Sequence, residues 1–192
     1  IGHYWEWASL YCCSSRSDAG KVMGLAAFGE KNKMSKEEVL SITDKGKLNL
    51  NFIELKKKFN DPNILSLDLS NSKHHQNVAL KVQSETETVI LKLLGILKEK
   101  FPTNTLYLSG GVALNVVANE RIIKSNLFKN VILNGSVEDG GTAIGAGLSV
   151  SLKLGYKRKS SAITDYYGRR YNYKEIIEAV SNYDFSYKIL TH

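Results

Sequence analysis

The segment 106–154 reads as two successive units of strand, glycine-rich turn and helix, and this alternation constrains the fold more than any other feature. The first strand covers Leu106–Ser109, and the second covers Val131–Leu133. A helical pattern follows each strand, over 112–124 and over 142–154. Strands that alternate with helices predict an α/β fold whose parallel strands are largely buried.

Paired glycines stand where each of these strands ends. Gly110 and Gly111 follow the first strand, and Gly140 and Gly141 follow the second, directly after Asp139. Glycine lets the backbone approach a ligand closely, and the free N–H groups of the following helix suit phosphate. Both turns should converge, since the carboxyl ends of adjacent parallel strands share one sheet edge. The sequence therefore predicts a nucleotide or phosphate-ester site.

Asp139 allows two interpretations. Its carboxylate could hold a divalent cation against bound phosphates. It could equally be the N-cap of the following helix, the commonest role of aspartate at such a position. The two roles are compatible, and Glu138 beside it is expected to be exposed.

One long amphipathic helix is predicted over 77–100, ended by Pro102. Its apolar stripe recurs at steps of three and four: Ala79, Val82, Thr86, Val89, Leu93 and Ile96. Glu85 falls beside this stripe, where it could simply be solvated. At the start of the helix, adjacent His74 and His75 point in different directions, so a solvated helix start is favoured over a metal site.

The N-terminal part should contain a short buried strand at Ser9–Cys13, then a short helix capped by Gly29. Residues 30–75 are more polar and irregular and are interpreted as a surface insertion. Within this insertion we expect a strand at Leu48–Phe52 and a helical turn at Ile53–Phe59.

The sequence changes character after Gly155. Residues 156–164 form a basic linker of small side chains, and 165–192 are expected to open a second α/β domain. The latter should contain a helix at Tyr173–Ser181 and a strand at Ser186–Leu190.

Charge and cysteine usage exclude some classes. The net charge of +7 is spread over lysines that are mixed with glutamates and lack interleaved aromatics, a pattern that disfavours nucleic-acid binding and favours anionic small substrates. No apolar run approaches the ~20 residues that a membrane span needs. Cys12 and Cys13 are adjacent, in no zinc-binding spacing and with no nearby base, so reduced thiols, a cytoplasmic location and no nucleophilic cysteine are expected.

Three motifs in series carry a family resemblance. They are GKVMGLAAFGE at 20–30, SGGVALNVVANERI at 109–122 and EDGGTAIGAG at 138–147. Together they resemble the O-carbamoyltransferases of nodulation-factor and antibiotic biosynthesis, which share an actin/Hsp70/sugar-kinase type of domain with threonylcarbamoyl-transferring tRNA-modification enzymes. The resemblance implies that 1–155 is the second half of the actin-like domain and that 165–192 begins the C-terminal domain.

The resemblance also implies an activity. Such enzymes make carbamoyl-adenylate from carbamoyl phosphate and ATP, and they pass the carbamoyl group to a hydroxyl of a sugar or natural product. The implied ATP-binding positions are Gly20, Lys21, Gly24, Gly110, Gly111, Val112, Asn115, Gly140 and Gly141. Asp139 corresponds to a ligand of the divalent metal (iron, manganese or magnesium), and no catalytic residue is assigned.

The family's other metal ligands, a histidine pair spaced HxxxH, do not occur in this sequence. They are expected upstream of Ile1, so the chain would be a fragment, inactive alone. Two alternatives stay open: a threonylcarbamoyl transferase acting on tRNA, and an actin-like nucleotide-binding module without transferase activity. From the residues themselves, Asn115 is equally consistent with a helix surface, Lys21 with an ordinary surface lysine, and Met23, Leu25, Val112, Val116 and Val117 with the core.

Overall fold

The protein is described by a computed structural model. The residues it describes are 1–34, 36–51, 53–54, 73–133, 135–157, 168–183, 186 and 188. Among these, helices predominate and the strands form two small sheets, which makes the fold mixed α/β.

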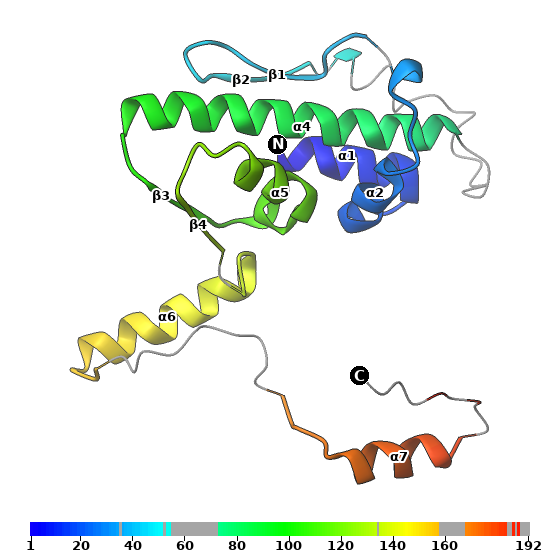
Figure 1. Ribbon diagram of the computed structural model, residues 1–192, viewed down its shortest axis with the longest axis vertical. Coiled ribbons are helices and arrows are strands. Elements are labelled where there is room, and N and C mark those ends of the chain that lie inside the picture. The colour runs from blue at the N-terminus through cyan, green and yellow to red at the C-terminus, as the bar shows by residue number, and fades with distance from the viewer. Residues whose placement is uncertain are drawn as a thin grey trace.

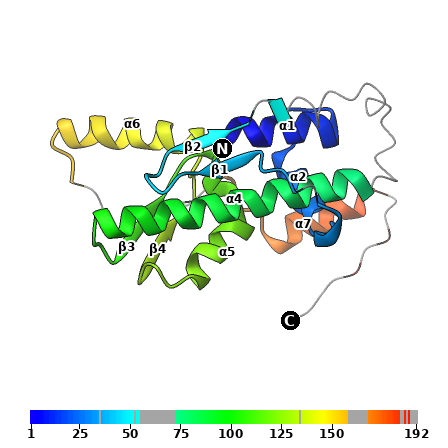
Figure 2. The ribbon, with the colours of Figure 1, turned by 90° about the horizontal axis from the view of Figure 1, so that it is seen from above.

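Helix α4 (Lys73–Lys100) is the centre of the molecule, and most other elements pack along it (Figure 1). It begins four residues earlier than expected, and its predicted stripe is confirmed because Ala79, Val82, Thr86 and Val89 are buried. Helix α1 (Gly2–Cys13) and helix α2 (Ala19–Ala26) lie against its N-terminal half. Helix α5 (Val116–Lys124) and the sheet of strands β3 (Thr105–Leu108) and β4 (Asn130–Leu133) lie toward its C-terminal half (Figures 1 and 2).

The prediction of a strand at Ser9–Cys13 is wrong. These residues are the last turns of helix α1 (Gly2–Cys13). The buried positions Tyr4, Trp5, Ala8, Tyr11 and Cys12 recur with helical spacing and face α2 and α4. Short apolar runs do not distinguish a strand from a buried helix, and here the preceding Tyr4 and Ala8 extend the helical period.

The predicted short helix is confirmed as helix α2 (Ala19–Ala26), but the prediction that Gly29 caps it is wrong. The helix ends before Ala27, and Gly29 does not have the positive φ of a left-handed cap. Gly29 is instead a site of close packing, because a Cβ there would lie 2.5 Å from Cβ of Leu80 and 2.6 Å from the carbonyl oxygen of Gln76. Glycine therefore lets this segment lie directly on α4.

The segment 30–51 is less peripheral than a surface insertion. After the 3₁₀ helix η1 (Lys31–Lys33), strands β1 (Leu40–Ile42) and β2 (Leu48–Leu50) form an antiparallel hairpin that lies along α4 (Figure 1). Val39 and Leu40 are 1% and 3% exposed and belong to the main core. The expected strand at Leu48–Phe52 is confirmed over Leu48–Leu50. Most of the helical turn expected at Ile53–Phe59 lies outside the described residues.

Strands β3 (Thr105–Leu108) and β4 (Asn130–Leu133) pair in parallel, as predicted. Leu106 and Leu108 of β3 and Val131 of β4 pack on a second cluster built around Leu94, Ile122 and Phe128. On the other side of the sheet Tyr107 is 69% exposed, so the sheet is covered on one face and the expected burial of both faces is wrong.

The first predicted helix, 112–124, is divided into the 3₁₀ helix η4 (Gly111–Leu114) and helix α5 (Val116–Lys124). Asn115 separates the two and is the N-cap of α5. This division turns Ala118 and Ile122 toward α4 and leaves Val116 63% exposed, which corrects its expected place in the core. Val117 is likewise 38% exposed.

Helix α6 (Asp139–Lys153) and helix α7 (Tyr173–Ser181) lie away from the α4 assembly (Figure 1). Neither contains a buried residue. The bounds of α7 agree with the prediction, and Asn172 with Glu175 forms a capping box at its start. The strand expected at Ser186–Leu190 lies mostly outside the described residues.

His74 and His75 differ in environment. His74 is exposed as expected, but His75 is only 7% exposed, with its ring edge-on to Tyr11 at 5.0 Å between centroids. Burial, and then the neighbouring His74, lower the pKa of His75 below its usual 6.5.

This lowered pKa predicts a pH dependence of stability. Above pH 6.5 the imidazole is neutral in both the folded and the unfolded chain, so it contributes no penalty. As the pH falls below 6.5 the unfolded chain takes up the proton first, and the free energy of unfolding decreases. Denaturant titrations at several pH values from 7.5 to 5 should show a smaller decrease for His75→Gln than for wild type. The exposed control His3→Gln should follow wild type, and equal pH slopes in all three proteins would contradict the assignment.

Candidate functional site

The two glycine turns are in direct contact, as the sequence predicts. In the parallel register Leu108 lies opposite Leu133, so both strands end at the same edge. Beyond that edge, the backbone N–H of Gly110 donates to the carbonyl of Val137 at 2.6 Å, and Ser109 Oγ donates to the same oxygen at 3.3 Å. These bonds hold the turns as one unit.

Gly110 and Gly111 present bare backbone at this edge. Gly110 has φ 92° and ψ 164°, a region that residues with a side chain rarely occupy. A Cβ built on either glycine would have no atom within 4 Å, and both residues are exposed. Gly110 is thus required by its conformation, whereas the surface at Gly111 is open to a ligand.

The second turn is shaped by Glu138. This residue is the N-cap of α6: its carboxylate accepts from the N–H of Gly140, and its carbonyl accepts from the N–H of Gly141 at 3.0 Å. Gly141 approaches the backbone so closely that a Cβ would collide with the carbonyl oxygen of Ser136. The N-cap interpretation of Asp139 is therefore wrong, and Glu138, which is partly buried, takes that role.

Asp139 is the first residue of α6 and is exposed at the joined turns. Its carboxylate lies where the positive end of the helix dipole favours negative charge. Across the described part of the chain, no three His, Cys, Asp or Glu side chains gather into a potential metal centre. A cation held at Asp139 would therefore need further ligands from outside the described residues.

Asn115 is buried between α5 and α4 rather than placed on a helix surface. Its Oδ1 accepts from the N–H of Ala118 at 2.9 Å, which caps α5. Its Nδ2 donates to Gln83 Oε1 at 2.9 Å, and Gln83 Nε2 donates back at 3.3 Å. The side chain thus ties the start of α5 to α4.

The α2 positions Gly20, Lys21 and Gly24 are exposed and are not brought against the glycine turns. Helix α2 packs on α1 and α4 instead. Lys21 Nζ pairs with Asp18 at 3.0 Å, and the lysine side chain is 72% exposed. Gly20 and Gly24 leave one face of α2 open, since a Cβ on either would meet nothing within 4 Å.

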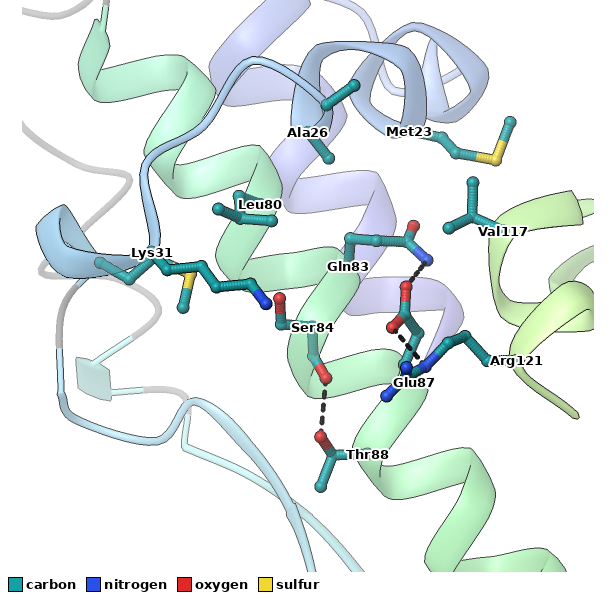
Figure 3. A pocket seen from close by; sticks show the side chains of 12 residues that line it. Met23, Ala26, Lys31, Leu80, Gln83, Ser84, Glu87, Thr88, Val117 and Arg121 are labelled. Atoms are coloured by element: carbon teal, nitrogen blue, oxygen red, sulfur yellow. Dashed lines mark hydrogen bonds and ion pairs between the residues drawn. The ribbon is translucent and has the colours of Figure 1, made fainter. Parts of the chain in front are cut away.

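A pocket of about 430 Å³ separates α2 from α5, with α4 as its floor (Figure 3). Apolar side chains line it from both helices, among them Met23 and Ala27 of α2 and Val117 of α5. Polar side chains line it from α4 and α5: Gln83 donates a hydrogen bond to Glu87, and Glu87 forms an ion pair with Arg121 (Figure 3). An apolar cavity with a few fixed polar groups is typical of small-molecule sites.

The sequence analysis missed this pocket. Gln83 and Glu87 are spaced four apart on α4, which was the available signal for a shared face. Asn115, the partner of Gln83, lies 32 positions further along the chain, and Arg121, the partner of Glu87, lies 34 positions further. Only the packing of α5 on α4 brings these residues together.

The interpretation of Glu85 as a solvated residue is wrong, because its side chain is only 12% exposed. The carboxylate pairs with Lys81 at 2.8 Å and accepts from Tyr4 Oη at 2.7 Å. It also accepts from the backbone N–H groups of Val39 and Leu40, each at 3.1 Å. The carboxylate therefore joins α1, α4 and β1.

The two cysteines lie on α1. Burial, and then Cys13, raise the pKa of the Cys12 thiol to about 12. Burial also raises the pKa of Cys13, followed by Asp18, whose effect Lys21 opposes. Both cysteines are free, and Cys12 is a neutral thiol at physiological pH.

A family model described as carbamoyltransferase N-terminus matches residues 1–148. The chain belongs to this family.

Individual relatives are longer than this chain. An uncharacterized protein of Synechocystis is 34% identical over 145 residues, covering 68% of the chain and 23% of the relative. One of Methanocaldococcus jannaschii is 30% identical over 166 residues, covering 81% and 26%. Nodulation protein NolO of Bradyrhizobium diazoefficiens is 25% identical over 153 residues, covering 78% and 28%. The chain therefore spans about a quarter of the length of these relatives.

Within the described residues, none of the helices has both the length and the apolar character needed to cross a bilayer. The 28-residue α4 is long enough but carries charges throughout.

Proposed function

We propose that the chain supplies the second half of an actin-like nucleotide-binding domain, over 1–155, in an ATP-dependent O-carbamoyltransferase. Residues 165–192 would begin the following domain. The observation that carries this proposal is the hydrogen bond from Gly110 to Val137, which joins the two glycine turns of a carbamoyltransferase-family chain into one phosphate-sized surface. Dependence on ATP favours the cytoplasm as the place of action.

The phosphates of ATP would lie along the joined turns. Gly111 and Val112 would offer backbone N–H groups from the first turn. The N–H groups of Gly110, Gly140 and Gly141 already bond to Val137 and Glu138, so these three glycines would contribute close approach of the backbone alone. Because no side chain projects from these glycines, the backbone can approach the phosphate oxygens directly. Asn115 would belong to the same site as the N-cap of α5.

The nucleoside would occupy the pocket between α2 and α5. Gly20, Lys21 and Gly24 are not among the residues that line this pocket, and as further proposed positions on α2 they would contact the adenosine from beside it. Met23 and Val117 provide apolar surface that suits the faces of a purine ring.

Asp139 would hold a divalent cation together with phosphate oxygens and ligands from outside the described residues. A bound cation of this kind neutralises phosphate charge and orients the transferred group. The chain's own contribution is to place a carboxylate beside the second turn and to exclude side chains from the phosphate path.

In the complete reaction, carbamoyl phosphate would be hydrolysed to carbamate and phosphate, and a carbamate oxygen would attack the α-phosphorus of ATP to give carbamoyl-adenylate with pyrophosphate as the leaving group. The hydroxyl oxygen of a sugar or natural product would then attack the carbamoyl carbon, with AMP as the leaving group and the hydroxyl proton released. The family and the relatives named as nodulation proteins support a small-molecule acceptor over tRNA.

Calorimetry of the full-length protein with ATP tests this proposal, with mass spectrometry for carbamoyl-adenylate after carbamoyl phosphate is added. Gly111→Ala should weaken ATP binding by about tenfold, since a methyl group would stand on the phosphate path. The fold should be unchanged because the added Cβ meets no atom within 4 Å.

Gly95→Ala is the matched control. It adds the same methyl group to an equally open position on α4, away from the turns. ATP should bind to this variant as to wild type. Absence of ATP binding by the wild-type protein, or equal affinity of the two variants, would contradict the proposal.

A further inference from the structure

We infer that Gln83, on α4, is a positioning residue. It holds Asn115 in the orientation that sets the phosphate-binding turn, and it couples this turn to the α2–α5 pocket. This inference rests on the proposed nucleotide site. Gln83 touches neither glycine turn, so its effect passes through Asn115.

The pair is built to hold a single geometry. Gln83 is 4% exposed and Asn115 is 9% exposed, so neither amide can exchange its partner for bulk water at low cost. The two side chains are joined in both directions, at 2.9 Å from Asn115 Nδ2 to Gln83 Oε1 and at 3.3 Å from Gln83 Nε2 to Asn115 Oδ1.

Asn115 controls both ends of the segment that follows the glycines. Its Oδ1 caps α5 through the N–H of Ala118, and its own N–H donates to the carbonyl of Val112 at 3.0 Å, within η4. Asn119, one turn into α5, reaches back from Nδ2 to the carbonyl of Ala113 at 2.7 Å. A change in Asn115 would therefore alter the direction of the amides in η4.

Glu87 determines the orientation of the side-chain amides of Gln83 and Asn115. Its carboxylate only accepts hydrogen bonds, so the near amide nitrogen of Gln83 must face it, at 2.7 Å. The oxygen of Gln83 then faces Asn115 Nδ2, which leaves Asn115 Oδ1 for the N–H of Ala118. Arg121 Nε holds the other carboxylate oxygen of Glu87 at 3.4 Å.

The series Arg121, Glu87, Gln83, Asn115 and Ala118 converges on Glu87, whose carboxylate accepts from Arg121 on one side and from Gln83 on the other. Gln83 accepts in turn from Asn115, and Asn115 accepts from the N–H of Ala118. The first three members of the series line the pocket proposed for the nucleoside (Figure 3), and its last two lie at the start of α5. A base or ribose that contacts Glu87 or Arg121 would stabilise the orientation in which the turn is ready for phosphate.

Gln83→Met tests this role because methionine keeps the size and removes every hydrogen bond of the amide. Calorimetry of the full-length variant should show ATP affinity reduced about tenfold and adenosine affinity changed less than about twofold. Hydrogen exchange without nucleotide should become faster over 116–120. The control Gln76→Met makes the same replacement on α4, at a residue that does not line this pocket, and should leave all three measurements unchanged.

A rescue experiment separates positioning from general damage. Gln83→Glu alone places two carboxylates together and should weaken ATP binding. In the double variant Gln83→Glu/Glu87→Gln, the amide at position 87 donates to the carboxylate at position 83. That carboxylate still accepts from Asn115 Nδ2, so the orientation of Asn115 is restored. ATP affinity should return to within about threefold of wild type. This swap also serves if Gln83→Met does not fold.

Three results would overturn the inference: equal loss of ATP and adenosine affinity in Gln83→Met, unchanged exchange over 116–120, or no recovery in the swap. A wild-type protein that binds neither ATP nor adenosine would instead refute the proposed function. In that case, hydrogen exchange still shows whether Gln83 holds the start of α5.

Discussion

Glu85→Ala is expected to destabilise the folded chain by about 3–5 kcal/mol, the largest loss of stability expected for a single substitution here. The change removes a buried carboxylate and leaves Lys81, whose side chain is 10% exposed, without its charge partner. It also removes the acceptor for Tyr4 Oη and for two backbone N–H groups of the β1 segment. Donors left buried without an acceptor account for much of the cost.

Glu120→Ala is the matched control, because Glu120 and Lys124 also form an i,i+4 ion pair on a helix, at 2.6 Å. Their side chains are 60% and 69% exposed, and an exposed pair of this kind contributes little to the free energy of unfolding. Urea titrations followed by circular dichroism compare the two variants. Similar midpoints for both would show that Glu85 does not join α1, α4 and β1 as described.

Asp139→Ala is expected to reduce metal-dependent turnover of the full-length protein by about a hundredfold or more, the largest effect on activity. The residue is exposed and Glu138 supplies the N-cap of α6, so the fold should be retained. Asp139→Asn should show a comparable loss, since it keeps the shape and removes the charge.

Turnover should be followed as carbamoyl-product formation over a range of metal concentrations, with thermal melting as the check of folding. Asp44→Ala is the control for loss of an exposed aspartate, because Asp44 is 96% exposed and pairs only with Lys92 among the contacts described. Turnover by Asp139→Ala at the wild-type rate would remove this carboxylate from the mechanism.

Local pattern was sufficient for much of the fold and for the glycine turns. The alternation of β3, η4–α5, β4 and α6 follows from hydrophobic period and glycine position, and parallel pairing then brings the two turns to one edge. The stripe of α4 and the bounds of α7 are equally local, because each depends on residues within a few turns of one another.

Local pattern failed where burial depends on a neighbour from elsewhere in the chain. The apolar run at Ser9–Cys13 fits a strand or a buried helix equally well, and only the packing of α1 on α2 and α4 decides for helix. Glu85 beside the stripe has the sequence context of a solvated residue. Its burial follows from Tyr4 and the β1 segment, neither of which is near it in sequence.

By itself, the sequence determined that two glycine turns follow neighbouring strand ends, because glycine spacing and strand ends are properties of the chain's own order. Only the tertiary structure decided which side chains meet between α4 and α5: Gln83 meets Asn115, and Glu87 meets Arg121, once α5 packs on α4. The physical reason is that a hydrogen bond or ion pair requires two groups within about 3–4 Å in a suitable orientation, and residue order alone does not encode that distance.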